Sequence, residues 1–312
     1  LADQVLDGVV EQLAEHGQVE VVEALAAQLP ARLTCRLLGY PENMWPQLKS
    51  WSERLMRTDD RDRSGRLFRE FFDANTELAT ALDPVAMPKV GCPADDLISI
   101  WVNARIDGDP LPPEAIVHEV GLFIAGGAET TRTAISHGLR AFCDESIDGP
   151  DQWEALAADP ALVPGAVEEV LRWVTPLNNF FRRAVADSDV GGQHIERGDR
   201  IMLVYPSANR DEAVFDDPFH FDIRRTPNPH LSFGFGTHLC IGANFARTTL
   251  AAVFGGLARR ATDLRVVNEP DVEPNIFARA VRRFDLAATL RSLVPRPRSG
   301  GSSVPTASGD AR

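Results

Sequence analysis

The sequence has few cysteines, no long apolar run and no excess of basic residues. Its four cysteines among 312 residues show no CxxC spacing, which excludes a disulfide scaffold and favours a reducing compartment, the cytoplasm. No apolar run reaches the ~18–20 residues of a membrane span, and the first residues do not resemble a signal peptide. The net charge of −13 argues against a nucleic-acid partner, which requires a basic face. We therefore expect a soluble protein of the cytoplasm without a membrane span.

Apolar periodicity predicts a mainly α protein with a small β region. Apolar residues recur at helical spacing through residues 1–82, which we expect to be helical throughout. After residue 175 the pattern changes to strands and turns, with a buried strand predicted at 201–205. Residues 264–294 are expected to form a closing hairpin and strand. The polar stretch 296–312 predicts a flexible tail.

One glycine-rich loop, residues 233–242, contains a single cysteine and leads directly into an amphipathic helix. Glycines allow turns that a Cβ would block, and the start of a helix stabilises a thiolate at Cys240. One thiolate cannot hold zinc, which requires about four protein ligands, but it can be the axial ligand of haem iron. Such a cysteine can also be a small buried apolar residue.

The spacing of this loop resembles the haem-binding loop of the cytochrome P450 family at Phe233, Gly236, His238, Cys240 and Gly242. The resemblance covers nearly all of residues 1–295, which we expect to form one domain, and it is closest to the bacterial soluble members. It implies haem b (iron protoporphyrin IX), with Cys240 as the iron ligand. Phe233, Gly234 and Gly242 would be further cofactor-binding residues of the loop.

A long apolar helix is predicted over residues 112–142, and its middle violates helical preferences. Gly126 and Gly127 each cost roughly 1 kcal/mol in a helix, and they precede Glu129 and Thr130. An acid beside an alcohol is suited to proton delivery. In the resembling family such a pair delivers protons to dioxygen, and the two glycines form the groove beside it. The alternative is a solvated glutamate and a core threonine.

Three further charged residues match a structural motif of the same family. Glu169 and Arg172 are three residues apart, so they share one helix face and can pair. By default such a pair is a surface ion pair of little value. In the family the pair is buried and joined by an arginine from a later loop. Arg225 matches that position better than Arg224 does.

Two basic residues match the positions that contact the haem propionates. Arg182 is one of them, with its neighbour Arg183 as the alternative, and His238 is the other. Two cations for two carboxylates is chemically reasonable. The resemblance thereby assigns cofactor contacts to the small β region as well as to the cysteine loop.

The activity implied by the resemblance is monooxygenation of a hydrophobic organic molecule. The sequence contains no flavin or Fe–S motif, so electrons from NAD(P)H would arrive indirectly, through ferredoxin and ferredoxin reductase or an equivalent pair. Residues 228–230 and 242–244 resemble actinobacterial members that act on sterol side chains or terpenoids. The substrate is thus expected to be hydrophobic, with a sterol or a terpenoid favoured.

The chain departs from the family pattern at its beginning. Members usually have a first quarter with early strands, a helix crossing one haem face and a propionate-binding basic residue, and residues 1–30 do not resemble it. We therefore expect an N-terminally incomplete P450 fold. Two alternatives follow: a haem-binding but catalytically incomplete fragment, and a peroxide-dependent peroxygenase, which would not need the pair Glu129 and Thr130.

Overall fold

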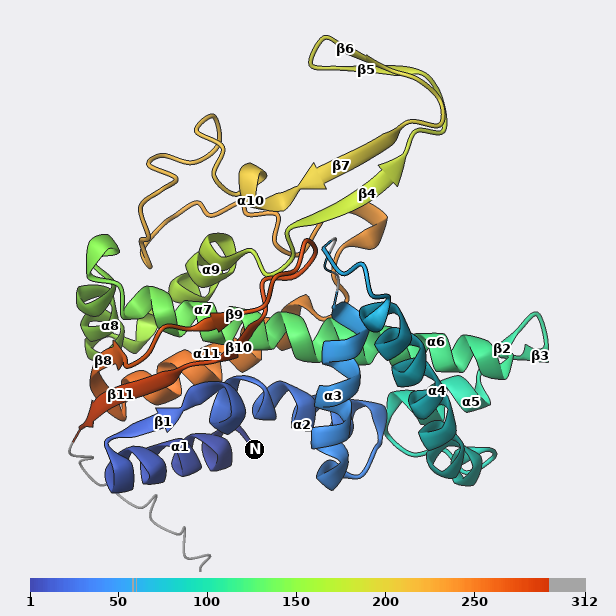
Figure 1. The fold of residues 1–312 in the computed structure, drawn as a ribbon, viewed down its shortest axis with the longest axis horizontal. Coiled ribbons are helices and arrows are strands. Elements are labelled where there is room, and N and C mark those ends of the chain that lie inside the picture. The colour runs from blue at the N-terminus through green and yellow to red at the C-terminus, as the bar shows by residue number, and fades with distance from the viewer. Residues whose placement is uncertain (58, 60, 292–312) are drawn as a thin grey trace, which may run out of the picture.

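The fold is mainly helical with small antiparallel sheets, as predicted (Figure 1). The computed structural model describes residues 1–57, 59 and 61–291, so the predicted tail at 296–312 lies outside the described residues. The longer helices are α1 (Ala2–His16), α2 (Gln28–Leu38), α3 (Trp45–Met56), α4 (Arg66–Ala86), α5 (Leu97–Asn103), α6 (Pro113–Ile124), α7 (Thr130–Phe142), α8 (Gly149–Ala158), α9 (Val163–Val174) and α11 (Ala243–Ala258). Short helical turns are η1 (Val22–Ala26), η2 (Glu42–Met44), η3 (Met87–Lys89), η4 (Ala125–Glu129), η5 (Glu145–Ile147), η6 (Pro160–Leu162), α10 (Tyr205–Ala208) and η7 (Gly236–His238).

Helix ends follow the local sequence. Gly17 and Gly39 take left-handed conformations (φ 70° and 86°) and end α1 and α2, because glycine adopts this conformation without a steric penalty. Asp96 begins α5, where its side chain accepts a hydrogen bond from the Ser99 amide. Pro113 occupies the first turn of α6, where its missing N–H costs nothing.

The strands form one three-stranded sheet and four two-stranded ribbons within the described residues. The strands are β1 (Gln18–Glu20), β2 (Arg105–Ile106), β3 (Asp109–Pro110), β4 (Asn179–Arg183), β5 (Ser188–Val190), β6 (Gln193–Ile195), β7 (Arg200–Val204), β8 (Ala261–Val266), β9 (Asp271–Val272), β10 (Val281–Arg283) and β11 (Asp285–Leu290). The expectation of helices throughout residues 1–82 was wrong at β1. This strand pairs with β11, with Val19 opposite Leu286. Three residues are too few to show strand periodicity, and their partner is far away in the chain.

The strand predicted at 201–205, which the structure forms as β7, was expected to be buried and is not. It pairs with β4, and its residues alternate between exposed and half-buried. Met202 and Val204 are exposed apolar residues. In the part of the chain that the structure describes, no third strand pairs with this ribbon, and the ribbon extends away from the helices (Figure 1).

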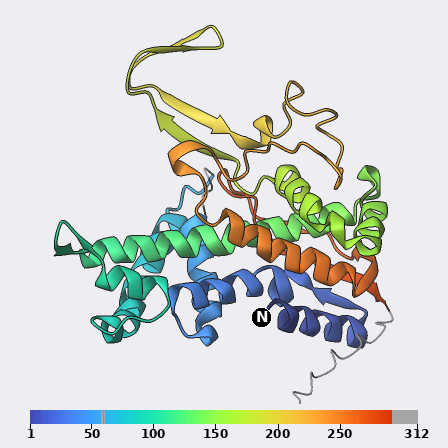
Figure 2. The ribbon, with the colours of Figure 1, turned by 180° about the vertical axis from the view of Figure 1, so that it is seen from behind.

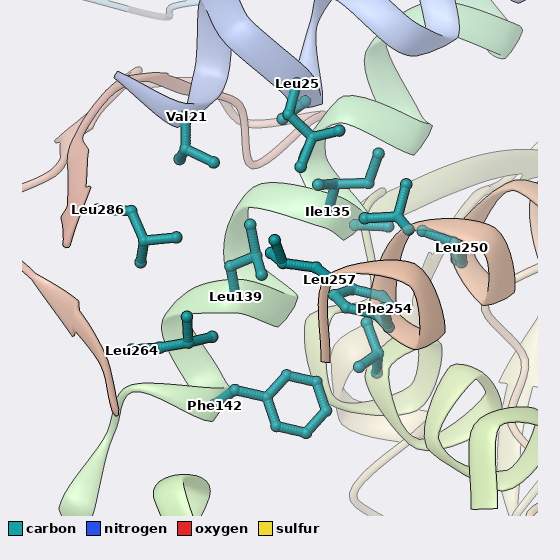
Figure 3. Packing of buried hydrophobic residues seen from close by; sticks show 14 of the residues in the cluster. Val21, Leu25, Ile135, Leu139, Phe142, Leu250, Phe254, Leu257, Leu264 and Leu286 are labelled. Carbon is teal, nitrogen blue, oxygen red and sulfur yellow. The ribbon is translucent and has the colours of Figure 1, made fainter. Parts of the chain in front are cut away.

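The helices bury two separate apolar cores. The larger core is built by α1, α7, α8, α9 and α11 with β8 and β11. Figure 3 shows its centre, where Leu139 and Phe142 of α7 lie beside Leu257 and Phe254 of α11. The smaller core is built by α2, α3, α4, α5 and α6.

One continuous rod, α6–η4–α7, connects the two cores. The buried residues of α6 belong to the smaller core, and those of α7 belong to the larger one. In Figures 1 and 2 the segment that leads into α11 lies between this rod and the β4–β7 ribbon. In these views the cysteine loop, which directly precedes α11, is therefore on the side of the rod that faces the ribbon. Within the described residues, no helix combines the length and apolar composition needed to cross a bilayer.

Candidate functional site

The cysteine loop has a backbone that only glycine adopts readily. Gly234 and Gly236 have left-handed conformations, with φ of 74° and 69°. The Cys240 amide donates to the Phe233 carbonyl at 2.9 Å, which closes the loop across seven residues. Helix α11 begins three residues after Cys240, and Gly242 directly precedes it. The loop is thus fixed by its own backbone rather than by packing over the cysteine.

Cys240 is exposed, and so are the apolar side chains next to it. Phe235 is 83% exposed, Ile241 88% and Leu239 59%. Exposed apolar residues clustered around a thiol are unusual for a soluble surface and fit a flat apolar ligand. Among the described residues, no cluster of three or more His, Cys, Asp or Glu side chains could hold a metal ion. The donor set therefore fits an iron that brings its other ligands with it, as haem iron does.

The middle of the α6–α7 rod is a π-turn, η4, which covers Ala125–Glu129. Such turns are rare and often lie at functional sites. The Thr130 hydroxyl donates to the Gly126 carbonyl at 2.6 Å, one turn earlier. A Cβ added at Gly126 would meet no atom within 4 Å, whereas one at Gly127 would lie 3.1 Å from Thr34 Oγ1 of α2. Gly126 therefore borders open space, and Gly127 allows α2 to approach.

Glu129, the last residue of η4, is buried, whereas Gly126 in the same turn is exposed. Glu129 is 3% exposed, and its Oε2 lies 3.3 Å from Arg132 Nη1. Burial raises the pKa of Glu129, and Arg132 opposes this rise only in part. Thr130 is half-buried, and it donates to the helix backbone rather than to the carboxylate. The acid and the alcohol are thus adjacent in sequence but point to different surroundings.

Glu169 and Arg172 form a fully buried pair between α9 and the loop before the cysteine. Arg172 Nε and Nη2 donate to the two Glu169 oxygens at 2.8 and 2.7 Å. Arg172 also donates to the carbonyls of Asn209, Pro218 and His220, at 2.8–3.0 Å.

Arg225 is the third member of this network, and Arg224 is exposed. Arg225 Nε lies 3.2 Å from Glu169 Oε2, and its other nitrogens donate to the carbonyls of Asp216, Asp217 and His220. Asn228 also donates to Glu169 Oε2, at 3.0 Å. Sequence reasoning did not find this role for Asn228, because an amide in an irregular loop has no periodicity to reveal it.

A second polar cluster fixes the start of the cysteine loop, and the sequence did not reveal it. Arg247 of α11 donates to both oxygens of Glu168, at 2.6 and 2.9 Å, and His230 lies 3.0 Å from the same carboxylate. The Arg247 guanidinium also lies 4.6 Å from the centre of the Phe233 ring, a cation–π distance. The carbonyl of Phe233 is the one that accepts from Cys240. Arg247 therefore connects α9 to the residue that closes the loop.

The candidate propionate contacts lie on the β4–β7 ribbon and on the cysteine loop. Arg182 is half-buried on β4, and its Nη1 donates to the Phe181 carbonyl at 3.0 Å. Its neighbour Arg183 is exposed. His238 is exposed in η7, two residues before Cys240. Both residues can turn toward an anionic ligand beside the loop.

The structure also contains an open groove of about 570 Å³ between α3 and α4. Its lining comprises Met44, Gln47, Trp51, Asp73, Thr76, Glu77, Thr80 and Ala81. None of the residues that the sequence singled out lines this groove. It is therefore separate from the cysteine loop and the π-turn.

Comparison with known proteins gives one consistent family. The family model for cytochrome P450 matches residues 150–260, which include α9 and the cysteine loop. A steroid C26-monooxygenase of Mycobacterium tuberculosis is 36% identical over 272 residues, covering 86% of this chain and 71% of the relative. A steroid C26-monooxygenase of Rhodococcus jostii is also 36% identical, over 84% of this chain and 54% of the relative. The chain thus spans between 54% and 71% of the length of these two relatives.

Solved structures agree with this assignment. A cytochrome P450 of Mycobacterium marinum, in complex with pseudoionone, superposes with a TM-score of 0.83 at 35% identity. The superposition covers 92% of this chain and 70% of that one. A Bacillus megaterium P450 in complex with corticosterone gives a TM-score of 0.80 at 28% identity, over 92% of this chain and 76% of that one.

Proposed function

Because the chain belongs to the cytochrome P450 family of monooxygenases, we propose that it inserts one atom of O₂ into a hydrophobic substrate, with electrons from a separate redox partner. Cys240 carries the proposal: it is an exposed thiol on a glycine-shaped loop closed by the bond to Phe233. When bound, haem b supplies the iron chemistry that activates O₂. The protein residues hold the cofactor, exclude water and move protons.

The cofactor-binding roles follow from the chemistry of each group. The Cys240 thiolate would hold the iron, and the loop of Phe233, Gly234 and Gly242 would keep that sulfur in place. Arg182 and His238 would bind the two propionates by charge-assisted hydrogen bonds. The exposed apolar side chains of the loop would be covered by the porphyrin, which excludes water from the thiolate.

Proton delivery is assigned to the middle of the α6–α7 rod. Gly126 leaves room beside the backbone, and the Thr130 hydroxyl lies one turn away from it. Burial raises the pKa of Glu129, which favours the protonated form of this carboxyl group. Thr130→Ala should therefore consume O₂ without a matching yield of product, which is measured as product formed per O₂ consumed. Unchanged coupling in that variant would refute the role of Thr130.

For the substrate we propose a sterol or a terpenoid. The support is the naming of the relatives as steroid C26-monooxygenases and the pseudoionone and corticosterone complexes of two structural neighbours. Ferredoxin with its reductase, drawing on NAD(P)H, is the proposed electron source. Product formation with peroxide alone, and none with ferredoxin and reductase, would instead favour the peroxygenase alternative.

The first test is the absorption spectrum of the reduced, CO-treated protein. We expect the strongly red-shifted Soret band of thiolate ligation, and its loss in Cys240→Ser. Cys92→Ser is the matched control, because Cys92 is also exposed but lies in a different part of the fold. A haem band without the red shift in the wild-type protein would contradict thiolate ligation, and no haem band would favour the catalytically incomplete fragment.

A further inference from the structure

Five side chains of alternating charge form a series that begins at the buried Glu129 and ends at the protein surface. Arg132 Nη1 lies 3.3 Å from Glu129 Oε2 and 2.6 Å from Glu53 Oε1 of α3. Lys49 Nζ lies 3.3 Å from the same Glu53 oxygen and 2.5 Å from Glu23 Oε1 of η1. The exposed side-chain fraction rises from 4% at Glu129 through 19% at Glu53 to 54% at Glu23. Three carboxylates therefore share two cations along a path that leads to solvent.

Arg132 contacts several partners at once, and its contact with Glu129 is weaker than its contact with Glu53. The Nε and Nη2 atoms of Arg132 donate to the Val281 carbonyl, at 3.1 and 2.7 Å. Only Nη1 remains for the carboxylates, and Glu53 is the nearer of the two. A buried arginine usually stabilises a carboxylate by two parallel hydrogen bonds. Glu129 has one long contact instead, so its burial is only partly compensated.

We propose that Glu53 is a positioning residue for proton delivery: by holding Arg132, it keeps Glu129 ready to bind a proton and pass it toward Thr130. Lys49 sets the strength of this hold, because it neutralises Glu53 from the other side. Each proton that is delivered first binds at the Glu129 carboxylate and then leaves it, so that the carboxylate returns to its ionised form before the next transfer. The role in turnover rests on the proposed monooxygenase function, whereas the coupling between the charges does not.

Other charged groups also face Glu129. Glu273, which follows β9, favours its protonated form, and Arg57, which follows α3, favours the ionised form. Arg57 Nε lies 2.7 Å from Glu273 Oε1, and Arg282 Nη2 of β10 lies 3.2 Å from the same oxygen. They therefore largely compensate one another. The imbalance around Glu129 comes from Arg132 and from its competitor Glu53.

The coupling can be measured without turnover. In infrared spectra of the full chain, the carbonyl stretch of a protonated carboxylic acid is assigned to Glu129 by its loss in Glu129→Gln. In Glu53→Gln, Arg132 can pair fully with Glu129, so the pH midpoint of this band should fall by about one unit. In Lys49→Met, Glu53 loses one of its two cations and depends on Arg132 alone, so the midpoint should rise. A general loosening of the fold would not shift the two variants in opposite directions.

The consequence for turnover is measured on the haem-loaded protein. Product formed per O₂ consumed should fall in Glu53→Gln at neutral pH, recover as the pH is lowered, and be restored by Glu53→Asp. Equal infrared midpoints, or shifts of the same sign in both variants, would overturn the proposal. Opposite shifts with unchanged O₂ coupling would overturn the role in proton delivery. If the wild-type protein forms no product, the proposed function fails, but opposite shifts would still support the charge coupling.

Discussion

Glu169 shows what a fully buried carboxylate requires from its neighbours. It accepts hydrogen bonds from Arg172, Arg225, Asn228 and the Asp222 amide. The two arginines in turn donate to carbonyls of the loop before the cysteine. One side chain thereby fixes an irregular segment that has little regular structure of its own.

Replacing Glu169 by glutamine should destabilise the protein by about 3–5 kcal/mol, because Arg172 would remain buried without its counter-charge. The free energy of unfolding in urea measures this loss, and haem uptake should fall with it. Glu212→Gln on the exposed part of the same loop is the control, with an expected change within about 0.5 kcal/mol. Equal stability of the two variants, with normal haem content, would rule out the structural role of Glu169.

Sequence predicted the charged residues of this network better than their uncharged partners. Glu169 and Arg172 have helical spacing, and Arg225 lies in a recognisable motif. Asn209 could not be predicted as a hub, although it is fully buried and its side chain binds Thr175, Leu231 and Ser232. Glu53 was not predicted either, because its importance depends on the approach of α3 to the middle of the rod.

At the scale of elements, the glycines of the rod serve two different purposes. A methyl group at Gly126 would point into open space, whereas Gly127 faces Thr34 of α2. Gly138, further along α7, is required for packing, because a Cβ there would lie 2.6 Å from Phe254 of α11. Gly126 is therefore costly for helix stability without a packing reason.

Gly126→Ala should leave the haem-free protein as stable or more stable, by up to about 1 kcal/mol, since alanine is the better helix former. It should nevertheless reduce product formed per O₂, because the methyl group enters the proposed oxygen groove. Gly8→Ala in α1 is the matched control, since a Cβ there also meets nothing within 4 Å. Full coupling in Gly126→Ala would mean that the space beside Gly126 is not used in the reaction.

At the scale of the whole molecule, Glu168 connects elements that are far apart in the sequence. It binds Arg247 of α11 and His230 of the intervening loop, and α9 carries it. Burial opposes its ionisation, but the hydrogen bonds from His230 and Arg247 outweigh burial and lower its pKa to about 2. Because the pKa of Glu168 is lower in the folded protein than its unfolded value of about 4.5, the ionised carboxylate stabilises the fold above pH 4.5. This contribution is lost as the pH falls toward 2.

Acid unfolding therefore tests this connection. Between pH 4.5 and 2, the wild-type protein should lose more unfolding free energy than Glu168→Gln does, because the variant has no carboxylate to protonate at this site. Glu11→Gln, on the exposed face of α1, should keep the wild-type slope. The measurement is a series of urea titrations across this pH range, and parallel curves for all three proteins would contradict the contribution of Glu168.

The sequence predicted the mainly α fold, the main helices and the cysteine loop, because long periodic segments and a spaced motif are local signals. It missed β1, whose partner β11 lies more than 260 residues away, and it predicted burial for β7, which is half exposed. These errors share a cause: the burial of a short strand depends on what packs against it. The surroundings of the Glu129 side chain could not be predicted for the same reason, because they depend on Arg132 and Glu53 together.

The π-turn in the rod also determines the directions in which the buried faces of α6 and α7 point. One extra residue in a helical turn rotates everything after it by about 100°. Ile116, Val120 and Ile124 can then face the smaller core, while Ile135, Leu139 and Phe142 face the larger one. Deleting one residue of η4 could leave a regular helix but would turn one of these faces toward solvent. The π-turn that contains Gly126 is thus also what lets a single helical rod contribute to both cores.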